Sequence, residues 1–540
     1  MWTGFCGSSR VEDPPPSSVK VSAKIEAEPG AFRARPLFGA TALLLYLALV
    51  KLLLHLLTAG NYGYFRDELY YMAAGERLDF GYVDFPPFVA FVTAATRAVL
   101  GDSLVALHFL PAVAGAVVVV LTGLMARELG GGRFAQALAA LAILISPNFL
   151  VFGTWVSMDA FDQLFWVSAA YVLILLLKRD QPRLWLLFGL FAGLGLLTKL
   201  TMLYFGFAVF AALLLTPARR HLRTRWPWLG GAVALVFLLP YLYWQVANGW
   251  PTLEFWGNYG RKVDPASPVE FLLEQVITMQ PPSAPIWLAG LCFFLFFRDG
   301  GPYRMLGFVY LILFAIFLLQ NSRFYFLAPA YPMLFAAGAV VIERFARRRL
   351  SWLKPVYIVV LVISGVVVAP ITVVPMLPVE TLAGITGSAG GDAGVEIETR
   401  EVAALPQNFA DRFGWEEMTA TVARVYERLP EEKKNEACVL TGNYGEAAAI
   451  GFFGDKLGLP EAISGHNSYY LWGPGSCTGE TVISVGVPRE RLEAVFGEIE
   501  QNDITRCRYC MPDEDNLPVY VCHDPKMPFR EAWPLFKHYD

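Results

Sequence analysis

Long apolar runs alternate with short polar segments over the first 375 residues of the chain. Each run is continuous rather than alternating, which favours helices that are apolar on all sides over half-buried strands. A helix needs about 20 apolar residues to cross a bilayer, and a lipid-exposed backbone must be helical or form a closed barrel. The pattern therefore predicts a polytopic α-helical membrane protein with about eleven transmembrane helices. The expected spans are residues 38–58, 104–126, 133–152, 161–177, 183–198, 200–216, 228–246, 285–298, 304–320, 324–342 and 355–375.

Two stretches decide the predicted topology. Residues 85–100 are apolar but short and contain Arg97, so we expect a helix that lies at the membrane surface. Residues 183–216 form either a tight hairpin of two helices or one overlong helix. Only the hairpin places the basic clusters on the side of the N-terminal tail, as the positive-inside rule requires. We therefore expect two helices with Lys199 at their outer turn. The basic clusters are Arg127/Arg133, Lys178/Arg179/Arg183, Arg219/Arg220/Arg223/Arg225, Arg298/Arg304 and Arg344/Arg347/Arg348/Arg349.

Composition agrees with a membrane protein and narrows its partners. The chain is 55% hydrophobic and 17% charged, with a net charge of -4, and no basic tract stands apart from the predicted membrane flanks. Nucleic acid is therefore not an expected partner. Residues 1–37 are mostly polar, include Pro14 to Pro16, and lack the apolar core of a cleaved signal peptide. We expect a disordered cytoplasmic tail there and a transmembrane domain at residues 38–377.

The C-terminal part of the chain, residues 378–540, changes character. Gly384–Gly394 is rich in Gly, Ala and Ser and is predicted to be a linker. Helical periodicity follows at Trp415–Leu429, and short apolar runs at 437–441, 481–487 and 519–522 predict strands. Helices mixed with strands indicate a small α/β domain, which the topology places outside the cytoplasm.

Five of the seven cysteines lie in this C-terminal part. They are Cys438, Cys477, Cys507, Cys510 and Cys522. A domain on the outer side permits disulfides, although an odd count leaves at least one thiol free. Cys507 and Cys510 have the spacing of half a zinc site, but a second close pair is missing. We expect disulfides or buried thiols there, and neither a metal nor another cofactor.

The predicted outer loops contain acidic residues that directly adjoin membrane spans. Asp67 and Glu68 follow the first span within an aromatic segment, and Asp159 lies in the next outer loop. A general base must be a carboxylate or a histidine held near the reaction, and none of the six histidines lies in these two loops. These carboxylates are therefore the candidate base. The alternative is structural, because Asp commonly caps helix N-termini.

Cationic residues at the outer ends of spans are candidates for binding an anionic group. Lys199 lies at an apolar turn, where burying its charge calls for an anionic partner such as a lipid phosphate. Arg323 lies in a similar position, and for both residues the alternative is a side chain that snorkels to the interface. Arg261 and Lys262 in the long loop 248–285 are weaker candidates, because charges in loops are usually just solvated.

Several short motifs, in order along residues 38–375, together resemble a known family. They are Arg-Asp-Glu-x-Tyr-Tyr from Arg66, Tyr-x-Asp-x-Pro-Pro around Asp84, Met-Asp at Asp159, Gly-Leu-x-x-Lys ending at Lys199, and Tyr-Phe-Leu-Ala-Pro-Ala-Tyr-Pro from Tyr325. The chain resembles the bacterial GT-C glycosyltransferases, which include the protein O-mannosyltransferases and the lipid A aminoarabinose transferases. The resemblance implies transfer of a sugar from a polyprenyl-phosphate carrier to a lipid, protein or polysaccharide acceptor, on the outer face of the bacterial inner membrane, with inversion.

The resemblance also implies roles for individual residues. Asp67 would be the catalytic carboxylate, Glu68 its companion and Asp159 the second acidic residue of the site. The donor phosphate would be bound by Arg66, Lys199, Arg323 and Tyr325. Asp84, Arg261 and His466 are candidate contacts to the substrates; the aromatic and polar run around His466 is otherwise an ordinary surface loop.

One position departs from the aminoarabinose transferases, and one other function must be weighed. Those enzymes have a lysine immediately before the Pro-Pro pair, and this chain has Phe85, so the donor phosphate needs another cation. A transporter or flippase of lipid-linked glycans is the alternative function. Transporters usually show ionisable residues in mid-span or broken helices in paired repeats. Here the charges lie at the ends of spans and the acids in outer loops, which favours catalysis.

Overall fold

The computed structural model describes residues 39–262, 267–348, 351–388 and 403–540. Residues 40–540 form one compact unit. The tail expected at residues 1–37 lies outside the described residues, as does most of the expected linker. Its first part, Gly384–Ser388, is not a linker, because it belongs to helix α17 (Val379–Ser388).

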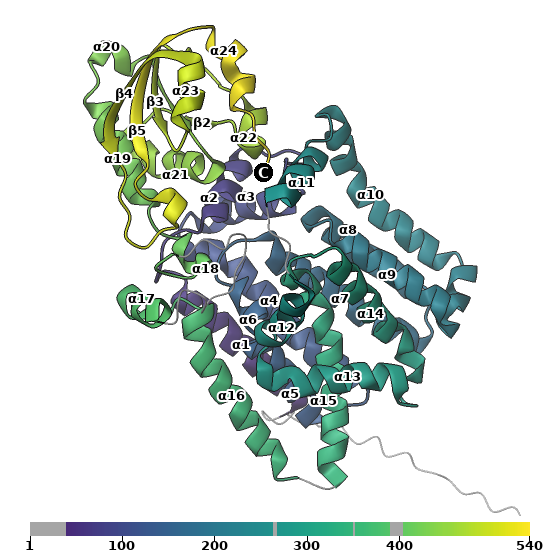
Figure 1. The fold of residues 1–540 in the computed structure, drawn as a ribbon. Helices are drawn as coiled ribbons and strands as arrows, with labels where there is room; N and C mark the ends of the chain where they lie inside the picture. Colours follow the sequence, from purple (N-terminus) through teal and green to yellow (C-terminus); the bar gives the residue numbers. More distant parts are fainter. Residues whose placement is uncertain (1–38, 263–266, 349–350, 389–402) are drawn as a thin grey trace, which may run out of the picture. The chain divides into compact units, whose positions relative to one another are not determined.

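Long apolar helices make up most of this unit (Figure 1). Within the described ranges, seven helical segments are long and apolar enough to cross a membrane, and two bent helix pairs raise that number to nine. The chain is a multi-pass membrane protein. The helices of the seven long segments are α1 (Ala40–Thr58), α4 (Leu104–Glu128), α7 (Met158–Arg179), α10 (Trp226–Ala247), α14 (Arg304–Leu319), α15 (Tyr331–Arg348) and α16 (Leu353–Thr372).

The prediction of eleven spans was right about the positions of the helices and wrong about their lengths. A helix lies at every expected position, but α5 (Arg133–Ile145) and α8 (Leu184–Thr198) are shorter than a span, and a break after α5 precedes Pro147 of α6 (Pro147–Val151). Two other expected spans belong to the bent pairs. Helix α9 (Met202–Leu215) is paired with the turn Pro217–Arg223, and α13 (Ala284–Phe296) is paired with α12 (Pro268–Thr278). At 1.5 Å per residue, α5 is only about 20 Å long.

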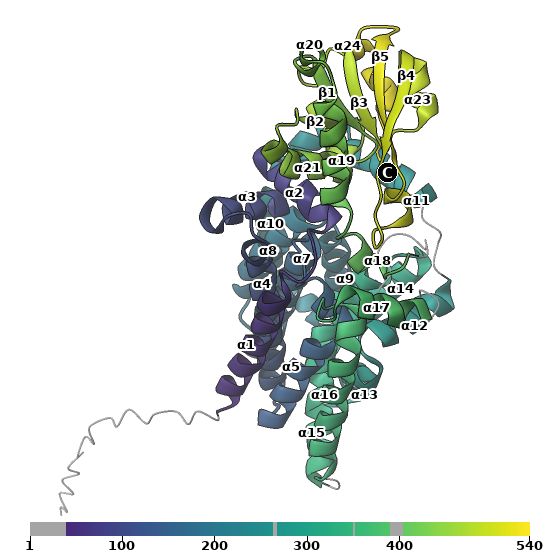
Figure 2. The same cartoon turned by 90° about the vertical axis from the view of Figure 1, so that its left-hand side faces the viewer.

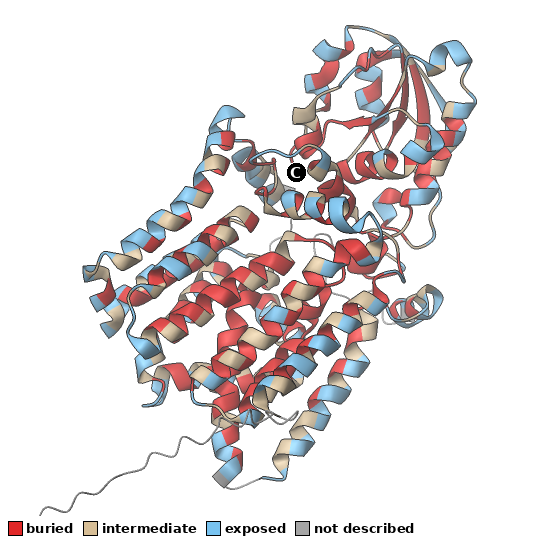
Figure 3. Ribbon diagram, turned by 180° about the vertical axis from the view of Figure 1, so that it is seen from behind, coloured by how far each residue is buried: buried red, intermediate tan, exposed pale blue. Residues whose placement is uncertain are grey.

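Burial separates inner from outer helices (Figure 3). Most of the apolar stretch of α7 is buried. Only 17% of the apolar stretch of α16 and 22% of that of α1 is buried. The outward side chains of α16 are nevertheless apolar, Val359, Ile363 and Val366 among them. A continuous exposed apolar surface of this kind suits lipid and not water.

Short helices lie next to the membrane helices. The two that matter most for the site are α2 (Arg66–Glu76) and α3 (Phe88–Leu100), which pack against each other. Helix α3 lies within residues 85–100, where a helix was predicted. The long loop contains α11 (Pro251–Lys262) and α12, and α18 (Gln407–Ala410) precedes the C-terminal region.

The C-terminal region is built on a mixed five-stranded sheet, which confirms the α/β prediction (Figure 2). The strand order is β2-β1-β3-β5-β4; β1 pairs in parallel with β2 and β3, and β5 pairs antiparallel with β3 and β4. The strands are β1 (Ala437–Thr441), β2 (Ala462–Ser464), β3 (Thr481–Val485), β4 (Phe496–Ile504) and β5 (Pro518–Pro525). The helices include α19 (Trp415–Glu427), α20 (Glu431–Lys434), α21 (Tyr444–Gly454), α22 (Asn467–Trp472), α23 (Arg489–Val495) and α24 (Phe529–Ala532).

Two of these strands were not predicted. Strand β2 has only three residues, and β4 is mostly exposed and polar, so neither has the apolar run of a buried strand. A disulfide joins Cys438 on β1 to Cys477. Cys507 and Cys510 are free thiols in close contact, with the Cys510 backbone N–H donating to the Cys507 Sγ over 3.1 Å.

Candidate active site

The acidic pair that follows the first membrane helix lies in the first turn of α2. The N-cap residue of this helix is Phe65, so Asp67 is not the cap, and Ser157 rather than Asp159 caps α7. Both aspartates instead lie in the first turn, where the partial positive charge of a helix N-terminus favours a carboxylate. The capping alternative is therefore wrong for both residues.

Asp67 is held between a cation and a phenol. Its Oδ1 accepts a hydrogen bond of 2.8 Å from the Tyr444 hydroxyl and lies 3.6 Å from Nε of Arg66. The Asp67 side chain remains 25% exposed. Arg66 also approaches Asp411, with 4.0 Å between Nη1 and Oδ1. Asp67 is thus an oriented carboxylate that solvent can still reach.

Glu68 points the other way and is fully buried. Its Oε2 accepts from the Phe65 backbone N–H at 2.9 Å, which completes the cap of α2. Its Oε1 lies 2.8 Å from Nε2 of His108 on α4 and accepts from the Val156 N–H at 3.3 Å. Glu68 therefore ties the start of α2 to α4 and to the loop before α7.

Asp159 and Lys199 form a second charged group. Lys199 lies in the turn between α8 and α9, as predicted, and its Nζ donates to Asp159 Oδ1 over 2.6 Å. The rings of Tyr325 and Phe326 cover the ammonium at 4.9 and 4.7 Å. Arg323 lies half-buried at the start of this aromatic segment, as the N-cap of the turn Phe324–Ala330. The anionic partner that Lys199 was expected to need is thus Asp159.

The loop before α7 connects the two charged groups. Trp155 stacks on Phe65 with ring centroids 4.5 Å apart, and the next residue, Val156, donates to Glu68. Arg412, from the C-terminal region, contacts the same loop, because its Nη2 donates a hydrogen bond of 2.8 Å to Thr154 Oγ1. Arg412 is only 2% exposed, and burial lowers its pKa to about 10. No motif pointed to Arg412 or Tyr444 in the sequence.

The three remaining candidates fall in different places. Asp84 accepts from the Tyr70 hydroxyl at 3.0 Å and from Nδ2 of Asn467 at 3.3 Å, so it joins the loop before α3 to α22. His466 lies against the ring of Tyr444, with centroids 4.9 Å apart. Arg261 is exposed on α11, where it contacts Asn258; no described contact joins it to Asp67 or Lys199.

One group of side chains has the composition of a metal site. Donor atoms of His466, His538 and Asp540 all lie within 4.8 Å of one another. The two imidazoles are stacked 4.5 Å apart and nearly parallel, whereas a metal binds in the plane of each ring. Nε2 of His466 lies 2.9 Å from the Asp540 backbone oxygen, and its Nδ1 lies 3.4 Å from the Tyr444 backbone N. The contacts are those of a hydrogen-bonded stack.

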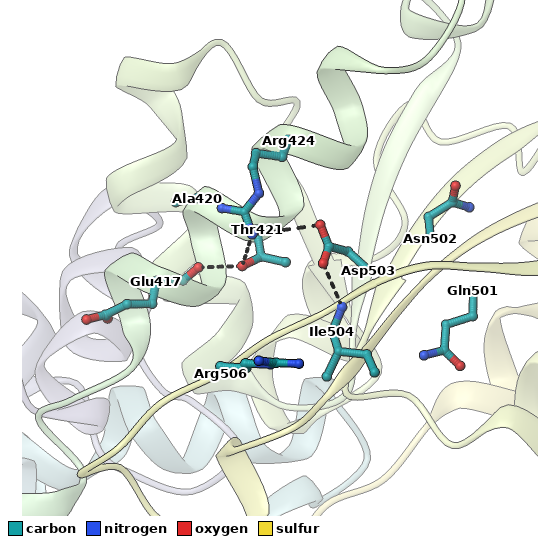
Figure 4. A pocket seen from close by; sticks show the side chains of 9 residues that line it. All are labelled: Glu417, Ala420, Thr421, Arg424, Gln501, Asn502, Asp503, Ile504 and Arg506. Atoms are coloured by element: carbon teal, nitrogen blue, oxygen red, sulfur yellow. Dashed lines mark hydrogen bonds and ion pairs between the residues drawn. The ribbon is translucent and has the colours of Figure 1, made fainter.

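A hollow of about 660 Å³ lies elsewhere, on the C-terminal region between α19 and β4 (Figure 4). Arg424 and Asp503 both line it, with 3.7 Å between Nη2 of Arg424 and Oδ2 of Asp503. None of the predicted site residues lines it.

Comparison with known proteins finds similar sequences and similar folds. The model of the dolichyl-phosphate-mannose-protein mannosyltransferase family matches residues 84–244. A lipid A galacturonosyltransferase of Rhizobium johnstonii is 30% identical over 191 residues, which make up 34% of this chain and 39% of that relative. The matched segment thus spans well under half of the relative. Apo ArnT from Cupriavidus metallidurans matches 89% of this chain and 98% of its own, with a TM-score of 0.60 at 17% identity.

The chain has the GT-C fold. The resemblance seen in the sequence motifs is therefore confirmed, and it extends beyond the motif-bearing segment, because the likeness to ArnT covers most of both chains. The same protein bound to undecaprenyl phosphate matches with a TM-score of 0.58 at 16% identity.

Proposed function

We propose that this protein is a glycosyltransferase that moves a sugar from a polyprenyl-phosphate carrier to an acceptor, with inversion and with Asp67 as the catalytic base. The proposal depends chiefly on one observation. Asp67 is a partly exposed carboxylate in the first turn of α2, the short helix that follows the first membrane helix, and it is fixed by a hydrogen bond from Tyr444 and flanked by Arg66. The family match, the galacturonosyltransferase relative and the ArnT fold support this class of reaction.

The reaction needs one base and a cation near the leaving group. Asp67 would accept the proton of a hydroxyl group on the acceptor. The oxygen of that hydroxyl group attacks the anomeric carbon from the face opposite the phosphate. The bond between that carbon and the phosphate oxygen breaks, and the electron pair leaves with the polyprenyl phosphate. A phosphate monoester leaves readily without protonation, so a second carboxylic acid of the kind that glycosidases use is not required.

Lys199 is the cation that we assign to the donor phosphate. Its ammonium lies where α8 meets α9, under Tyr325 and Phe326. A positive charge held there stabilises the negative charge that develops on the departing phosphate. Asp159 orients the lysine through its hydrogen bond, and Arg323 begins the neighbouring aromatic turn.

Phe85 explains why the cation must come from elsewhere in this chain. The position that holds a lysine in the aminoarabinose transferases is here part of an aromatic core, in which Phe85 packs on Tyr70, Tyr71 and Tyr82. A charge at this position would be buried without a partner, at a cost of several kcal/mol. Lys199, which lies at the turn between α8 and α9, provides a cation instead.

The reaction is assigned to the extracytoplasmic face of a bacterial inner membrane. The basic clusters at the ends of the helices support an orientation in which the loops with Asp67 and Lys199, and the C-terminal region with them, face outward. The Cys438–Cys477 disulfide supports the same orientation, because disulfides persist in oxidising compartments. The acceptor is then a lipid, a protein or a polysaccharide of the cell envelope.

The proposal is tested with purified protein in lipid nanodiscs, incubated with a panel of polyprenyl-phosphate sugars and an envelope extract as acceptor. Release of free polyprenyl phosphate together with a glycosylated product is the expected result. The Lys199→Ala variant should release less polyprenyl phosphate than the wild type at low donor concentration. Lys178→Ala, in the last turn of α7, should release as much as the wild type. Movement of intact lipid-linked sugar across proteoliposomes without phosphate release would contradict a transferase.

A further inference from the structure

Tyr444 connects the C-terminal α/β region to the proposed base. It is the first residue of α21 and donates its phenolic hydrogen to Asp67, 377 positions earlier in the chain. We infer that Tyr444 is a positioning residue for Asp67, so that the C-terminal region completes the active site instead of merely covering it. This inference rests on the proposed function of Asp67.

The backbone at Tyr444 is fixed from within the C-terminal region. Asn443 caps α21, its Oδ1 accepting from the Glu446 N–H at 2.9 Å. The amide of Asn443 also donates to Oε1 of Glu514 over 2.9 Å, which ties the start of the helix to the loop before β5. A helix start held by such contacts places the next side chain in a defined direction.

The ring of Tyr444 is fixed by neighbours on several sides. It stacks on Tyr70 of α2 with centroids 4.5 Å apart, and the imidazole of His466 lies 4.9 Å away. The guanidinium of Arg66 lies 5.5 Å from the ring centroid. These contacts hold the phenol in the orientation in which its hydroxyl meets Asp67, so little rotational entropy remains to be lost during the reaction.

A second set of contacts fixes α2 against the same region. Tyr70 accepts from the Ser468 N–H at 3.1 Å, and the Val83 N–H donates to Ser468 Oγ over 3.1 Å. Gly445 lets the two parts approach closely, because a Cβ there would come within 2.5 Å of Cγ of Arg66. Both partners of the Tyr444–Asp67 hydrogen bond are thus held by the same interface.

The hydrogen bond has two expected effects on the base. It limits rotation of the Asp67 carboxylate, which keeps the carboxylate aimed at the incoming hydroxyl. It also stabilises the ionised form, because a donor to a carboxylate favours the charged state. The charged groups that the described contacts place around this carboxylate include Arg66 beside it, and Asp411 and Glu514 close to Arg66.

The test compares Tyr444→Phe with Tyr469→Phe. Phenylalanine keeps the ring and its stacking at both positions. Tyr469 belongs to the same buried cluster, and its ring centroid lies 6.1 Å from that of Tyr70. No described hydrogen bond involves the Tyr469 hydroxyl. It is therefore a matched control for loss of a phenol at this interface.

We expect Tyr444→Phe to lower kcat about tenfold or more, because hydrogen bonds to charged groups are the stronger class. The acid limb of the pH–rate profile should move upward by about one pH unit, while KM for the donor stays within about twofold. Tyr469→Phe should match the wild type in kcat and in the acid limb. A Tyr444→Phe enzyme with the kcat and acid limb of the wild type would overturn the inference.

An infrared titration separates this inference from the proposed function. The carboxyl band of Asp67 is identified by its loss in Asp67→Asn, and its midpoint is followed in the full-length protein without any substrate. Tyr444→Phe should raise that midpoint and Tyr469→Phe should not. If the wild type transfers no sugar, the proposed function fails, and an unchanged midpoint in Tyr444→Phe would independently refute the positioning role.

Discussion

Glu68→Gln gives a sharp test of how the start of α2 is built. The two oxygens of Glu68 accept from three donors: the Phe65 N–H at Oε2, and His108 and the Val156 N–H at Oε1. An amide presents only one acceptor oxygen, so in either orientation at least one buried donor faces an NH₂ group. Leaving a buried donor unsatisfied costs about 1–3 kcal/mol. The lost charge near the buried Arg412 adds to this, and the expected total is about 3 kcal/mol.

The assay is reversible unfolding in mixed micelles, followed by tryptophan fluorescence. The control is Glu76→Gln at the other end of α2, because the Glu76 side chain is 59% exposed and its pair with Arg97 lies at the surface. Exposed pairs contribute about 0–1 kcal/mol, so the control should differ little from the wild type. A Glu68→Gln protein as stable as the control would refute the view that these three hydrogen bonds hold the start of α2.

Three further predictions concern the donor site, the disulfide and pH. Lys199→Ala should reduce kcat/KM for the donor about tenfold to a hundredfold in transfer assays, since contacts to phosphate are charge-assisted, and Lys199→Arg should retain more of it; equal values for the two variants would count against a role for the charge. Reduction of Cys438–Cys477, which are 39 positions apart, should lower the free energy of unfolding by about 4 kcal/mol in chemical denaturation, and an unchanged value would argue against the bond. Burial, followed by the charge of Asp513, raises the pKa of Glu514 to about 7, above its value in the unfolded chain. The folded state then binds the extra proton, so the stability contribution is complete below about pH 4 and declines as the pH rises through 7. Glu514→Gln should flatten this decline in a series of thermal melts; an equally steep decline would show that other groups cause it.

The fold was predictable from sequence as far as apolar continuity determines it. Helices lie at each expected span, because an apolar run in lipid has few alternatives to a helix. Their lengths were not predictable, since a single Ser146–Pro147 break interrupts an otherwise apolar run after α5. The bend between α12 and α13 does have a local signal, because Gln280 and the turn Pro281–Ser283 separate the two helices. In the C-terminal region β4 was missed because an exposed edge strand has no apolar run to reveal it.

Members of the candidate site were predictable only where they are close to membrane helices in sequence. Asp67, Asp159 and Lys199 each adjoin a span, and the cost of placing charge there singled them out. The pairing of Lys199 with Asp159, 40 positions apart, depends on how α7, α8 and α9 pack and has no local signal. Tyr444 and Arg412 reach the site from hundreds of positions away, as ordinary members of an aromatic and a polar segment.

The central claim is that Asp67 is the base of a sugar transfer from a polyprenyl-phosphate donor. The most direct measurement is transfer of radiolabelled sugar in membranes that contain the wild type, Asp67→Asn or Asp102→Asn at equal amounts. Asp102 is a suitable control, because it is a partly exposed aspartate after α3 that pairs with Arg97. We predict that Asp67→Asn loses transfer by a factor of about 100 or more while Asp102→Asn retains it. Wild-type transfer by Asp67→Asn would contradict the account.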